Sequence, residues 1–278
     1  MDNYKTQLLT TSNIKTLLKP RDFSANKGDY GHSLLIAGGM GKMGAAVIAA
    51  RACLRSGTGL LTVCVPKSER SILQTAIPEA MISFREDNTD FSNISAVGIG
   101  PGIGLGKGTG KTLKNLLKHF NGAVLLDADA LNLLAANHKL FKKLPKVTVI
   151  TPHPKEFDSL FGSHASEEER RNAAIDLAIK LELVIVLKGH QTLVTTAGCS
   201  FLSTAGNAGL AKGGSGDALT GIITALLAQG YESFVAAKIG VYLHGLAADI
   251  ALVEQSMESM LIDDVIACLG EAFKQTMA

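Results

Sequence analysis

The chain has 278 residues, of which 46% are hydrophobic, and its formal net charge is +2. This length suits one large α/β domain, and no Pro/Ser-rich linker, low-complexity tract or internal repeat divides the chain. We therefore expect a single domain over residues 1–278, with residues 1–20 as a short N-terminal extension. Acidic and basic residues are interleaved along the chain, which gives no reason to expect a nucleic-acid or membrane partner.

The N-terminal residues are polar and lack the apolar core of a secretory signal. The apolar run 240–253 is interrupted by His244 and Asp249, so no membrane span is predicted, and His244 is expected to be a packed core histidine. The four cysteines are widely scattered without a Cys-x-x-Cys pair. These features favour a cytoplasmic protein with reduced, buried thiols.

Short aliphatic runs alternate with longer helical patterns, which predicts a mostly parallel central sheet with helices on both faces. The expected strands are residues 33–37, 60–65, 96–99, 123–126, 147–150 and 184–187, followed by a hairpin-like pair at 192–196 and 200–203. The expected helices are residues 44–56, 67–76, 107–120, 130–136, 154–161, 166–180, 217–229, 233–253 and 262–274.

The first expected strand leads into a glycine pattern that resembles a dinucleotide-binding fingerprint. Residues 39–44 fit Gly-x-Gly-x-x-Gly between a strand and a helix. A Rossmann site requires an acid at the end of the next strand, and residues 60–66 end without one. Lys42 is followed by Met43, which also excludes a Walker loop. The pattern therefore disfavours a Rossmann NAD site.

Polar and glycine residues follow several strands at the edge where open α/β sheets bind ligands. The run 98–104 holds four glycines and is either a ligand loop or a tight turn. Asp127 ends the next strand and could hold Mg²⁺, whereas capping is the favoured interpretation for Asp129. His153 could bind a ligand or cap a helix, and Lys188 is either a phosphate-binding cation or a solvated loop lysine.

Residues 206–222 carry the most informative pattern. Gly213, Gly214 and Gly216 surround Ser215, and Asp217 follows at the start of an apolar helix. Helix N-termini present unpaired N–H groups and a partial positive charge, so this turn predicts a phosphate cradle. Asp217 could then remove a proton from a hydroxyl that attacks the bound phosphoryl group. The alternative is an ordinary glycine-rich turn in which Asp217 only interacts with the helix dipole.

Six segments in order resemble the NAD(P)H-hydrate dehydratase family of the ribokinase-like superfamily. They are residues 31–39, 100–104, 126–132, 151–157, 187–189 and 206–222. The superfamily's kinases carry Asn-x-x-Glu where this chain has His153-x-x-Glu156, which fits the dehydratases better than a plain kinase. Val47 departs from the family, since many members have proline near that position.

The resemblance implies a role for particular residues. Asp217 would be the catalytic base, and Mg²⁺ would be positioned by Glu156 and Asp127. The substrate would contact Gly44, Ala45, Gly104, His153 and Asp217. ADP would contact Lys188, Gly189, His190, Gln191, Thr192, Gly214, Ser215 and Gly216.

The same resemblance implies ADP-dependent dehydration of the S epimer of NADH hydrate or NADPH hydrate, with release of AMP and phosphate, by a homotetramer. The main alternative is a small-molecule kinase of the ribokinase or hydroxyethylthiazole kinase type. A third hypothesis is a catalytically silent nucleotide-binding module. Asp217 and the glycines around it argue against the silent module, because a binding module has no need of a base at that position.

Overall fold

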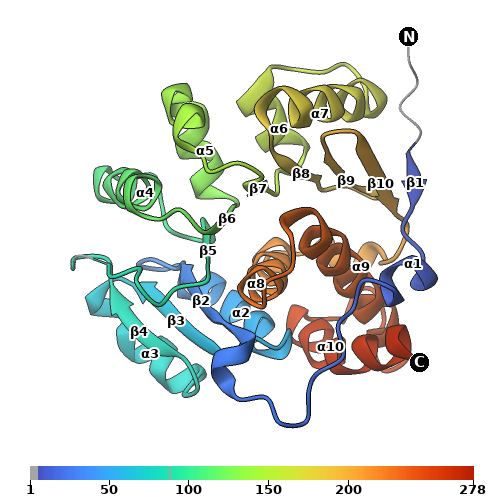
Figure 1. Ribbon diagram of the computed structural model, residues 1–278, viewed down its shortest axis with the longest axis horizontal. Helices are drawn as coiled ribbons and strands as arrows, with labels where there is room; N and C mark the ends of the chain where they lie inside the picture. The colour runs from blue at the N-terminus through green and yellow to red at the C-terminus, as the bar shows by residue number, and fades with distance from the viewer. Residues whose placement is uncertain (1–5, 88) are drawn as a thin grey trace.

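The structure is a computed structural model that describes residues 6–87 and 89–278. Ten strands form one sheet in the order β1-β10-β9-β8-β7-β6-β5-β2-β3-β4 (Figure 1). Strand β9 runs antiparallel to both neighbours, and the other strand pairs are parallel. This confirms the predicted mostly parallel α/β sheet. The single domain stays a prediction, which the continuous sheet supports.

The structure confirms every expected strand, with small shifts at the ends. The strands are β2 (His32–Ile36), β3 (Leu60–Val65), β5 (Ala96–Ile99), β6 (Ala123–Leu126), β7 (Val149–Ile150), β8 (Val184–Leu187), β9 (Thr192–Thr196) and β10 (Cys199–Ser203). Two edge strands were not predicted, β1 (Gln7–Leu8) and β4 (Met81–Phe84). Both lie at the ends of the sheet, where less apolar surface is buried and the sequence pattern is correspondingly weak.

The expected helices are also present. They are α2 (Met43–Arg55), α3 (Arg70–Ala76), α4 (Lys107–His119), α5 (Asp129–Ala136), α6 (Pro154–Phe161), α7 (Glu167–Leu181), α8 (Ser215–Ala228), α9 (Ser233–Ala251) and α10 (Ile262–Met277). The start of the expected helix 67–76 is a 3₁₀ turn, η2 (Lys67–Glu69); three further 3₁₀ turns are η1 (Lys27–Tyr30), η3 (His138–Lys143) and η4 (Ala208–Leu210). The N-terminal extension contains α1 (Thr11–Lys15), whose Ile14 is fully buried. Part of the extension is therefore integrated into the core.

Helices cover both faces of the sheet (Figure 1). Helices α4 to α7 pack on one face, where Val97 and Val124 point, and α2, α8, α9 and α10 pack on the other, where Ala96 and Leu125 point. Consecutive strand residues thus enter different cores. This explains why the strands read as unbroken apolar runs rather than as alternating patterns.

Helix α9 has the length and composition of a membrane span, but 67% of its apolar window is buried inside the protein. A core helix meets the same criteria, so the helix is weak evidence for membrane insertion. It packs against α8 and α10 (Figure 1).

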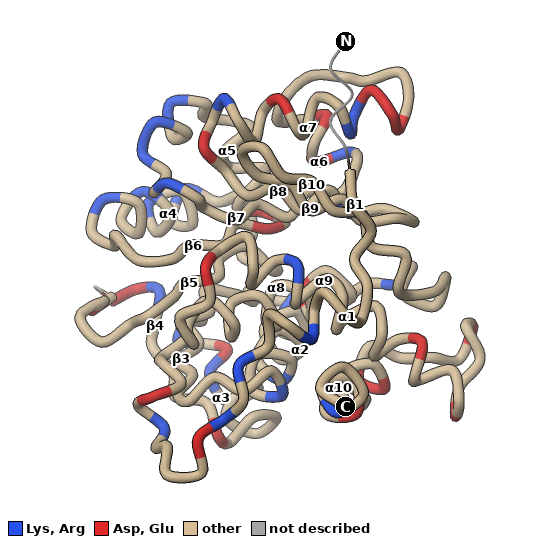
Figure 2. The backbone as a smooth tube through the Cα atoms, turned by 45° about the vertical axis from the view of Figure 1, so that its right-hand side comes forward, with Lys and Arg blue, Asp and Glu red and all other residues tan. Residues whose placement is uncertain are grey.

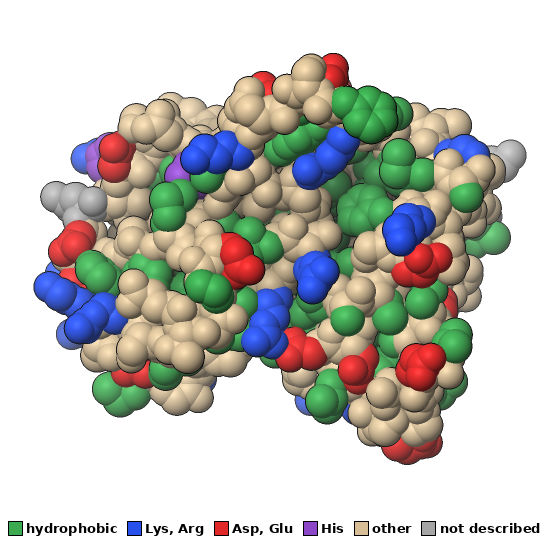
Figure 3. All heavy atoms as spheres, turned by 90° about the horizontal axis from the view of Figure 1, so that it is seen from below, with side chains coloured by type: hydrophobic (Ala, Val, Ile, Leu, Met, Phe, Trp, Pro, Cys, Tyr) green, Lys and Arg blue, Asp and Glu red, His purple; other side chains and the backbone are tan. Residues whose placement is uncertain are grey.

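Surface charge is less even than the sequence suggests. Acidic and basic side chains are mixed over the face in Figure 3, whereas Figure 2 shows lysines gathered around α4. Neither α4 nor η3, which contacts it, contains an acidic residue. The exposed lysines are Lys107, Lys111, Lys114, Lys118, Lys139, Lys142 and Lys143.

All four cysteines are free thiols, as predicted, but they are not all buried. Cys53 and Cys64 lie in the core, Cys268 is half-buried and Cys199 is exposed. Cys199 is exposed because it lies beside the hairpin turn, where β10 begins.

Close packing of α8 against α2 generates a stability prediction. A Cβ added at Gly221 of α8 would lie 2.1 Å from the Ala49 carbonyl oxygen of α2. We expect Gly221→Ala to lower the free energy of unfolding by about 1–3 kcal/mol, because the helices must separate.

Gly270→Ala is the matched control. Gly270 is an exposed α10 glycine whose added Cβ meets no atom within 4 Å, so alanine should stabilise by about 0.5–1 kcal/mol. Urea unfolding of both variants tests this, and equal effects would contradict it.

Candidate functional site

The carboxyl ends of five adjacent strands form the edge of the sheet at which the predicted site residues lie. Strands β2 and β5 are neighbours, but the chain continues from β2 toward β3 and from β5 toward β6, on opposite sides. Ligands of open α/β sheets bind at such a switch point. The loops after β5, β6, β7 and β8 and the first turns of α2 and α6 carry most of the predicted residues, and α8 begins beside them.

The predicted anion cradle is the start of α8. Gly214 is the N-cap residue, with φ +98° and no side-chain cap, and a Cβ there would lie 2.7 Å from Ile48 Cδ1 of α2. Glycine is therefore required at this position. The helix begins at Ser215, two residues earlier than predicted, so Ser215, Gly216 and Asp217 form the first turn, whose N–H groups can bind an anion.

Lys188 places a positive charge against this first turn. Its Nζ lies 2.8 Å from Asp127 Oδ1 and 3.9 Å from Glu156 Oε2. A Cβ on Gly216 would lie only 3.2 Å from the same nitrogen. Burial opposes the charge of Lys188, but Asp127 and the neighbouring acids outweigh burial and raise the pKa of Lys188. The lysine is thus held charged at the cradle and is not a solvated loop residue.

Asp127 is a buried acid that joins three elements. Its carboxylate accepts hydrogen bonds from Thr151 Oγ1 at 2.8 Å, Lys188 Nζ at 2.8 Å and Thr220 Oγ1 at 2.9 Å. Three protein donors leave little room for a metal ion, so we expect Asp127 to orient Lys188. Within the described ranges 6–87 and 89–278, no three His, Cys, Asp or Glu side chains cluster as a metal site.

Asp217 is partly buried in the first turn of α8. Burial raises its pKa to about 6, and the negative charges of Asp127 and Asp129 act in the same direction, whereas Lys188 opposes them. A carboxylate with this pKa accepts a proton more readily than an ordinary aspartate and is still ionised at neutral pH.

His153 and Glu156 form a capping box at the start of α6. His153 Nδ1 accepts from the Glu156 N–H at 3.1 Å, and Glu156 Oε2 accepts from the His153 N–H at 2.9 Å. The capping alternative for His153 is therefore present in the structure, and its contact with substrate stays a prediction. Burial raises the pKa of Glu156, while Lys188 lowers it in part.

Asp129 does not cap α5, contrary to the sequence interpretation. The N-cap residue is Ala128, with φ 48° and no side-chain hydrogen bond. Asp129 Oδ2 instead accepts a hydrogen bond from the Gly104 N–H at 2.8 Å, which joins the start of α5 to the loop after β5. The acid therefore positions a glycine that was predicted to contact substrate.

Of the three small residues predicted to contact substrate, Gly44 and Ala45 lie in the first turn of α2 and Gly104 lies on the loop after β5. Gly44 is exposed, and Ala45 and Gly104 are half-buried. A Cβ at Gly44 or Gly104 would meet no protein atom within 4 Å, so packing does not require glycine there. Gly104 has φ +76°, which does favour glycine.

A cavity of about 560 Å³ opens from the cradle toward α9. Among the predicted nucleotide residues, it is lined by Lys188, Gly189, His190, Thr192, Ser215 and Gly216. Gln191 instead lines a neighbouring cavity of about 180 Å³. Sequence reasoning missed the far wall, which includes Leu210, Val241 and Gly245. Val241 and Gly245 lie on α9 outside any motif, and Leu210 lies within the 206–222 pattern but was assigned no role.

His244 also lines this cavity, although it is buried as predicted. Burial, together with the charge of Lys188, lowers the pKa of His244 to about 4. The imidazole is therefore neutral at physiological pH.

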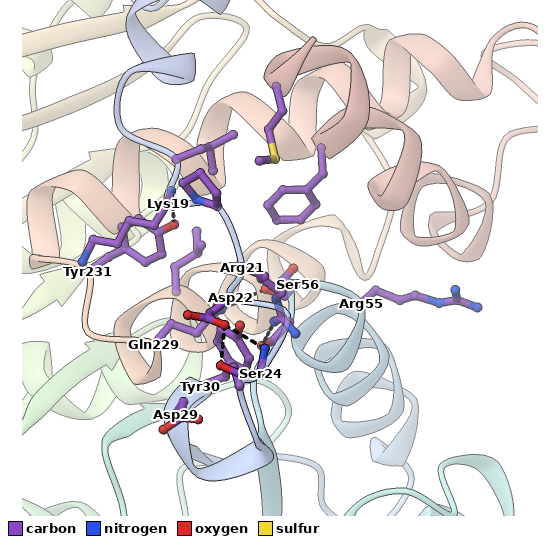
Figure 4. A pocket seen from close by; sticks show the side chains of 17 residues that line it. Lys19, Arg21, Asp22, Ser24, Asp29, Tyr30, Arg55, Ser56, Gln229 and Tyr231 are labelled. Atoms are coloured by element: carbon purple, nitrogen blue, oxygen red, sulfur yellow. Dashed lines mark hydrogen bonds between the residues drawn. The ribbon is translucent and has the colours of Figure 1, made fainter.

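A larger cavity, of about 780 Å³, lies at the opposite end of α8 (Figure 4). Leu226 and Gln229 reach it from that end of the helix, and two of the cations that line it stack on tyrosines, Lys19 over Tyr231 and Arg21 over Tyr30. None of the predicted site residues lines it. This cavity is therefore not the candidate site, although its volume is larger.

Comparisons with known proteins agree with the geometry. The model of the NAD(P)H-hydrate dehydratase family matches residues 33–270. This chain belongs to the NAD(P)H-hydrate dehydratase family. An ADP-dependent (S)-NAD(P)H-hydrate dehydratase of Bacillus subtilis is 32% identical over 275 residues, covering 96% of this chain and 97% of the relative.

Other members of the dehydratase family are longer. The bifunctional NAD(P)H-hydrate repair enzyme Nnr of Moorella thermoacetica is 34% identical over 281 residues, which cover 95% of this chain and 53% of the relative. The chain thus spans about half the length of the bifunctional relatives that it matches.

Solved structures share the fold. The crystal structure of ADP/ATP-dependent NAD(P)H-hydrate dehydratase from B. subtilis, co-crystallised with ATP/Mg²⁺, has a TM-score of 0.89 and 30% identity, and covers 99% of this chain and 100% of that chain. A hydroxyethylthiazole kinase from Pyrococcus horikoshii has a TM-score of 0.63 at 15% identity, with coverage of 94% and 92%. This second likeness shows the ribokinase-like fold alone.

The ion pair beneath the cradle generates the second prediction. We expect Lys188→Met to lower the free energy of unfolding by about 3 kcal/mol, because Asp127 would keep a buried charge without its cation. Adding Asp127→Asn to Lys188→Met should restore at least part of the loss. Lys180→Met, at an exposed lysine of α7, is the control. Chemical denaturation measures all three, and a Lys188→Met loss no larger than the control's would contradict the prediction.

Proposed function

We propose that this protein catalyses the ADP-dependent dehydration of the S epimer of NADH hydrate or NADPH hydrate, producing NADH or NADPH, AMP and phosphate. The observation that carries the proposal is Asp217, an acid with a pKa of about 6 in the first turn of α8, next to Lys188. A base and an anion cradle at one place suit phosphoryl transfer to a hydroxyl group. The relatives' activity supports the same reaction.

The nucleotide occupies the cavity between the cradle and α9 in this proposal. The N–H groups of Ser215 and Gly216, with Lys188, bind the terminal phosphate of ADP. The adenosine lies along Gly189 to Thr192, with the apolar wall at Leu210 and Val241 behind it. Because these groups are fixed before the reaction, they stabilise the developing charge without reorganisation.

Asp217 removes the proton from the hydroxyl on the hydrated nicotinamide ring. The hydroxyl oxygen then forms a bond to the β-phosphorus of ADP, and the bond from that phosphorus to the bridging oxygen breaks, which releases AMP. The ring nitrogen's lone pair expels the new phosphate group, and loss of a proton from the adjacent ring carbon restores the dihydronicotinamide. Transfer of the phosphoryl group thus turns hydroxide, a poor leaving group, into phosphate.

Mg²⁺ fits this site as a partner of the nucleotide. Magnesium commonly binds one or two carboxylates together with substrate phosphates, and Glu156 is the acid that could contribute. When bound, the ion would neutralise charge on the transferring phosphoryl group. The Asp127 carboxylate supports this arrangement through Lys188. Gly44, Ala45 and Gly104 contact the hydrated nucleotide on the other side of Asp217, and His153, which also lines the nucleotide cavity, contacts it from that cavity.

We further propose a cytoplasmic location and a homotetramer, which rest on the resemblance to the family. The small-molecule kinase remains the second candidate function, because the cradle and base would serve it equally well. His153-x-x-Glu156 favours the dehydratase.

The decisive experiment follows all three products of the reaction. Purified protein given the S epimer of NADH hydrate, Mg²⁺ and ADP should restore the reduced-nicotinamide absorbance while AMP and phosphate form in equal amounts. If ATP serves far better than ADP, the proposed donor is wrong and the dehydration stands. If neither nucleotide restores the absorbance but a small alcohol is phosphorylated, the protein is a kinase. Unchanged ADP in both assays would identify a silent module.

The role of Asp217 generates a kinetic prediction. Asp217→Asn should lower turnover by about two to four orders of magnitude, because the base is lost. The unfolding midpoint at pH 7 should be unchanged or higher. The folded pKa of about 6 lies above the ordinary value, so the ionised carboxylate disfavours the folded state at neutral pH. Stopped assays and thermal unfolding measure the two effects.

The same base sets a pH dependence. In the wild type, kcat/KM should fall as the pH drops through about 6, because protonation of Asp217 removes the base. An Asp217→Asn enzyme that keeps turnover within about threefold of the wild type would contradict the role. So would a wild-type profile that stays flat from pH 5 to pH 8.

A further inference from the structure

Arg85 ties together two loops that lie far apart in sequence. It directly follows the edge strand β4, and its backbone N–H donates to the Val65 carbonyl at the end of β3, at 3.1 Å. Its side chain donates through Nη2 to the carbonyls of Ala37, at 2.7 Å, and Gly38, and through Nη1 to the Ile103 carbonyl, at 3.2 Å. The guanidinium therefore bridges the loops after β2 and β5.

These two loops flank the switch point of the sheet and are pressed together. The Gly38 N–H donates to the Pro101 carbonyl at 2.7 Å, and a Cβ at Gly39 would lie 2.9 Å from the Gly102 carbonyl oxygen. One backbone hydrogen bond and the guanidinium thus set the separation of the loops. Both loops lead directly into the small residues expected to contact substrate.

The bridge fixes the chain immediately before Gly104. The Ile103 carbonyl accepts from Arg85 Nη1 and also from Thr109 Oγ1, at 3.0 Å. The next N–H, that of Gly104, donates to Asp129 Oδ2 at 2.8 Å. The peptide unit between Ile103 and Gly104 is therefore held at both its oxygen and its nitrogen, in a conformation with φ +76°.

Arginine is suited to this position in a way that lysine is not. A planar guanidinium presents five donors in a rigid fork, so one side chain can bind carbonyls from two loops at once. Hydrogen bonds with one charged partner are also stronger than neutral ones. A lysine ammonium is a point charge on a flexible stem and would hold the two loops less firmly.

We propose that Arg85 is a positioning residue for the nicotinamide nucleotide. By fixing the loops after β2 and β5, it holds Gly44, Ala45 and Gly104 at the spacing that the substrate requires. The assignment of the substrate rests on the function proposed above. The clamp, which is the bridge that Arg85 makes between the loops after β2 and β5, rests on the geometry alone. Arg85 makes no contact with the nucleotide cavity lined by Lys188 and Gly216.

Kinetics of two variants test the proposal. Arg85→Met should lower kcat/KM for the S epimer of NADH hydrate by about 10- to 100-fold, through a raised KM, because the loops no longer hold the substrate in place. Its kcat at saturation should stay within about threefold of the wild type. Calorimetric AMP affinity should be unchanged. Arg85→Lys, which keeps one charged donor, should give an intermediate KM.

Arg70→Met is the matched control. Arg70 lies on the adjacent α3, and its Nη1 makes one exposed hydrogen bond, to the Lys67 carbonyl at 3.0 Å. This substitution removes a nearby guanidinium without touching either loop. Its KM and AMP affinity should equal those of the wild type.

Amide hydrogen exchange tests the clamp without any assay of activity. Arg85→Met should speed exchange in residues 38–45 and 101–106 and leave residues 206–212 unchanged. An unchanged KM together with unchanged loop exchange overturns the proposal. Faster exchange throughout the protein with weaker AMP binding also overturns it, because Arg85 would then be generally structural. If the wild type does not convert the hydrate, the proposed function fails, and the exchange experiment still decides the clamp.

Discussion

The contact between Lys188 and Asp127 is the interaction on which the candidate site depends. Asp127 is 1% exposed, and burying a carboxylate is costly unless a cation and hydrogen-bond donors surround it. Lys188 and Thr151, directly after β8 and β7, and Thr220 of α8 supply them. The pair therefore fixes the first turn of α8 against the sheet edge and leaves the lysine's charge directed at the cradle.

Rigid packing behind α8 makes that cradle a preformed site. The helix is buried along almost its whole length, and the absence of a side chain at Gly221 lets α2 approach the helix backbone. Gly214 likewise accommodates Ile48 of α2 at the first turn. An anion site built this way need not reorganise when charge develops on a phosphoryl group, which is the condition for electrostatic catalysis.

The sequence predicts the central fold and the nucleotide half of the site well. Interior strands such as β5 and β6 bury both faces, so their apolar runs are unambiguous, and the glycines around Ser215 form a local motif. Edge strand β4 buries less, and Arg85, which directly follows it, acts through contacts with carbonyls distant in sequence. Asp129 was misread for the same reason, since its partner Gly104 is 25 residues away. Local patterns cannot reveal groups whose partners are set by tertiary packing.

Asp217 lies where two halves of the sheet edge meet, and this position connects kinase-like geometry with dehydration. On one side, Lys188 and the first turn of α8 form a phosphate cradle that a kinase would also need. On the other, the first turn of α2 and the loop after β5 present Gly44, Ala45 and Gly104, and a Cβ at Gly44 or Gly104 would meet no protein atom within 4 Å. A substrate with a hydroxyl next to a ring nitrogen would lose its phosphate group as soon as it received it, because the nitrogen's lone pair expels it. The same base and phosphate cradle therefore serve a kinase or a dehydratase, depending on which alcohol binds on the second side of Asp217. The loops at the switch point, after β2 and β5, thus decide between phosphorylation and dehydration.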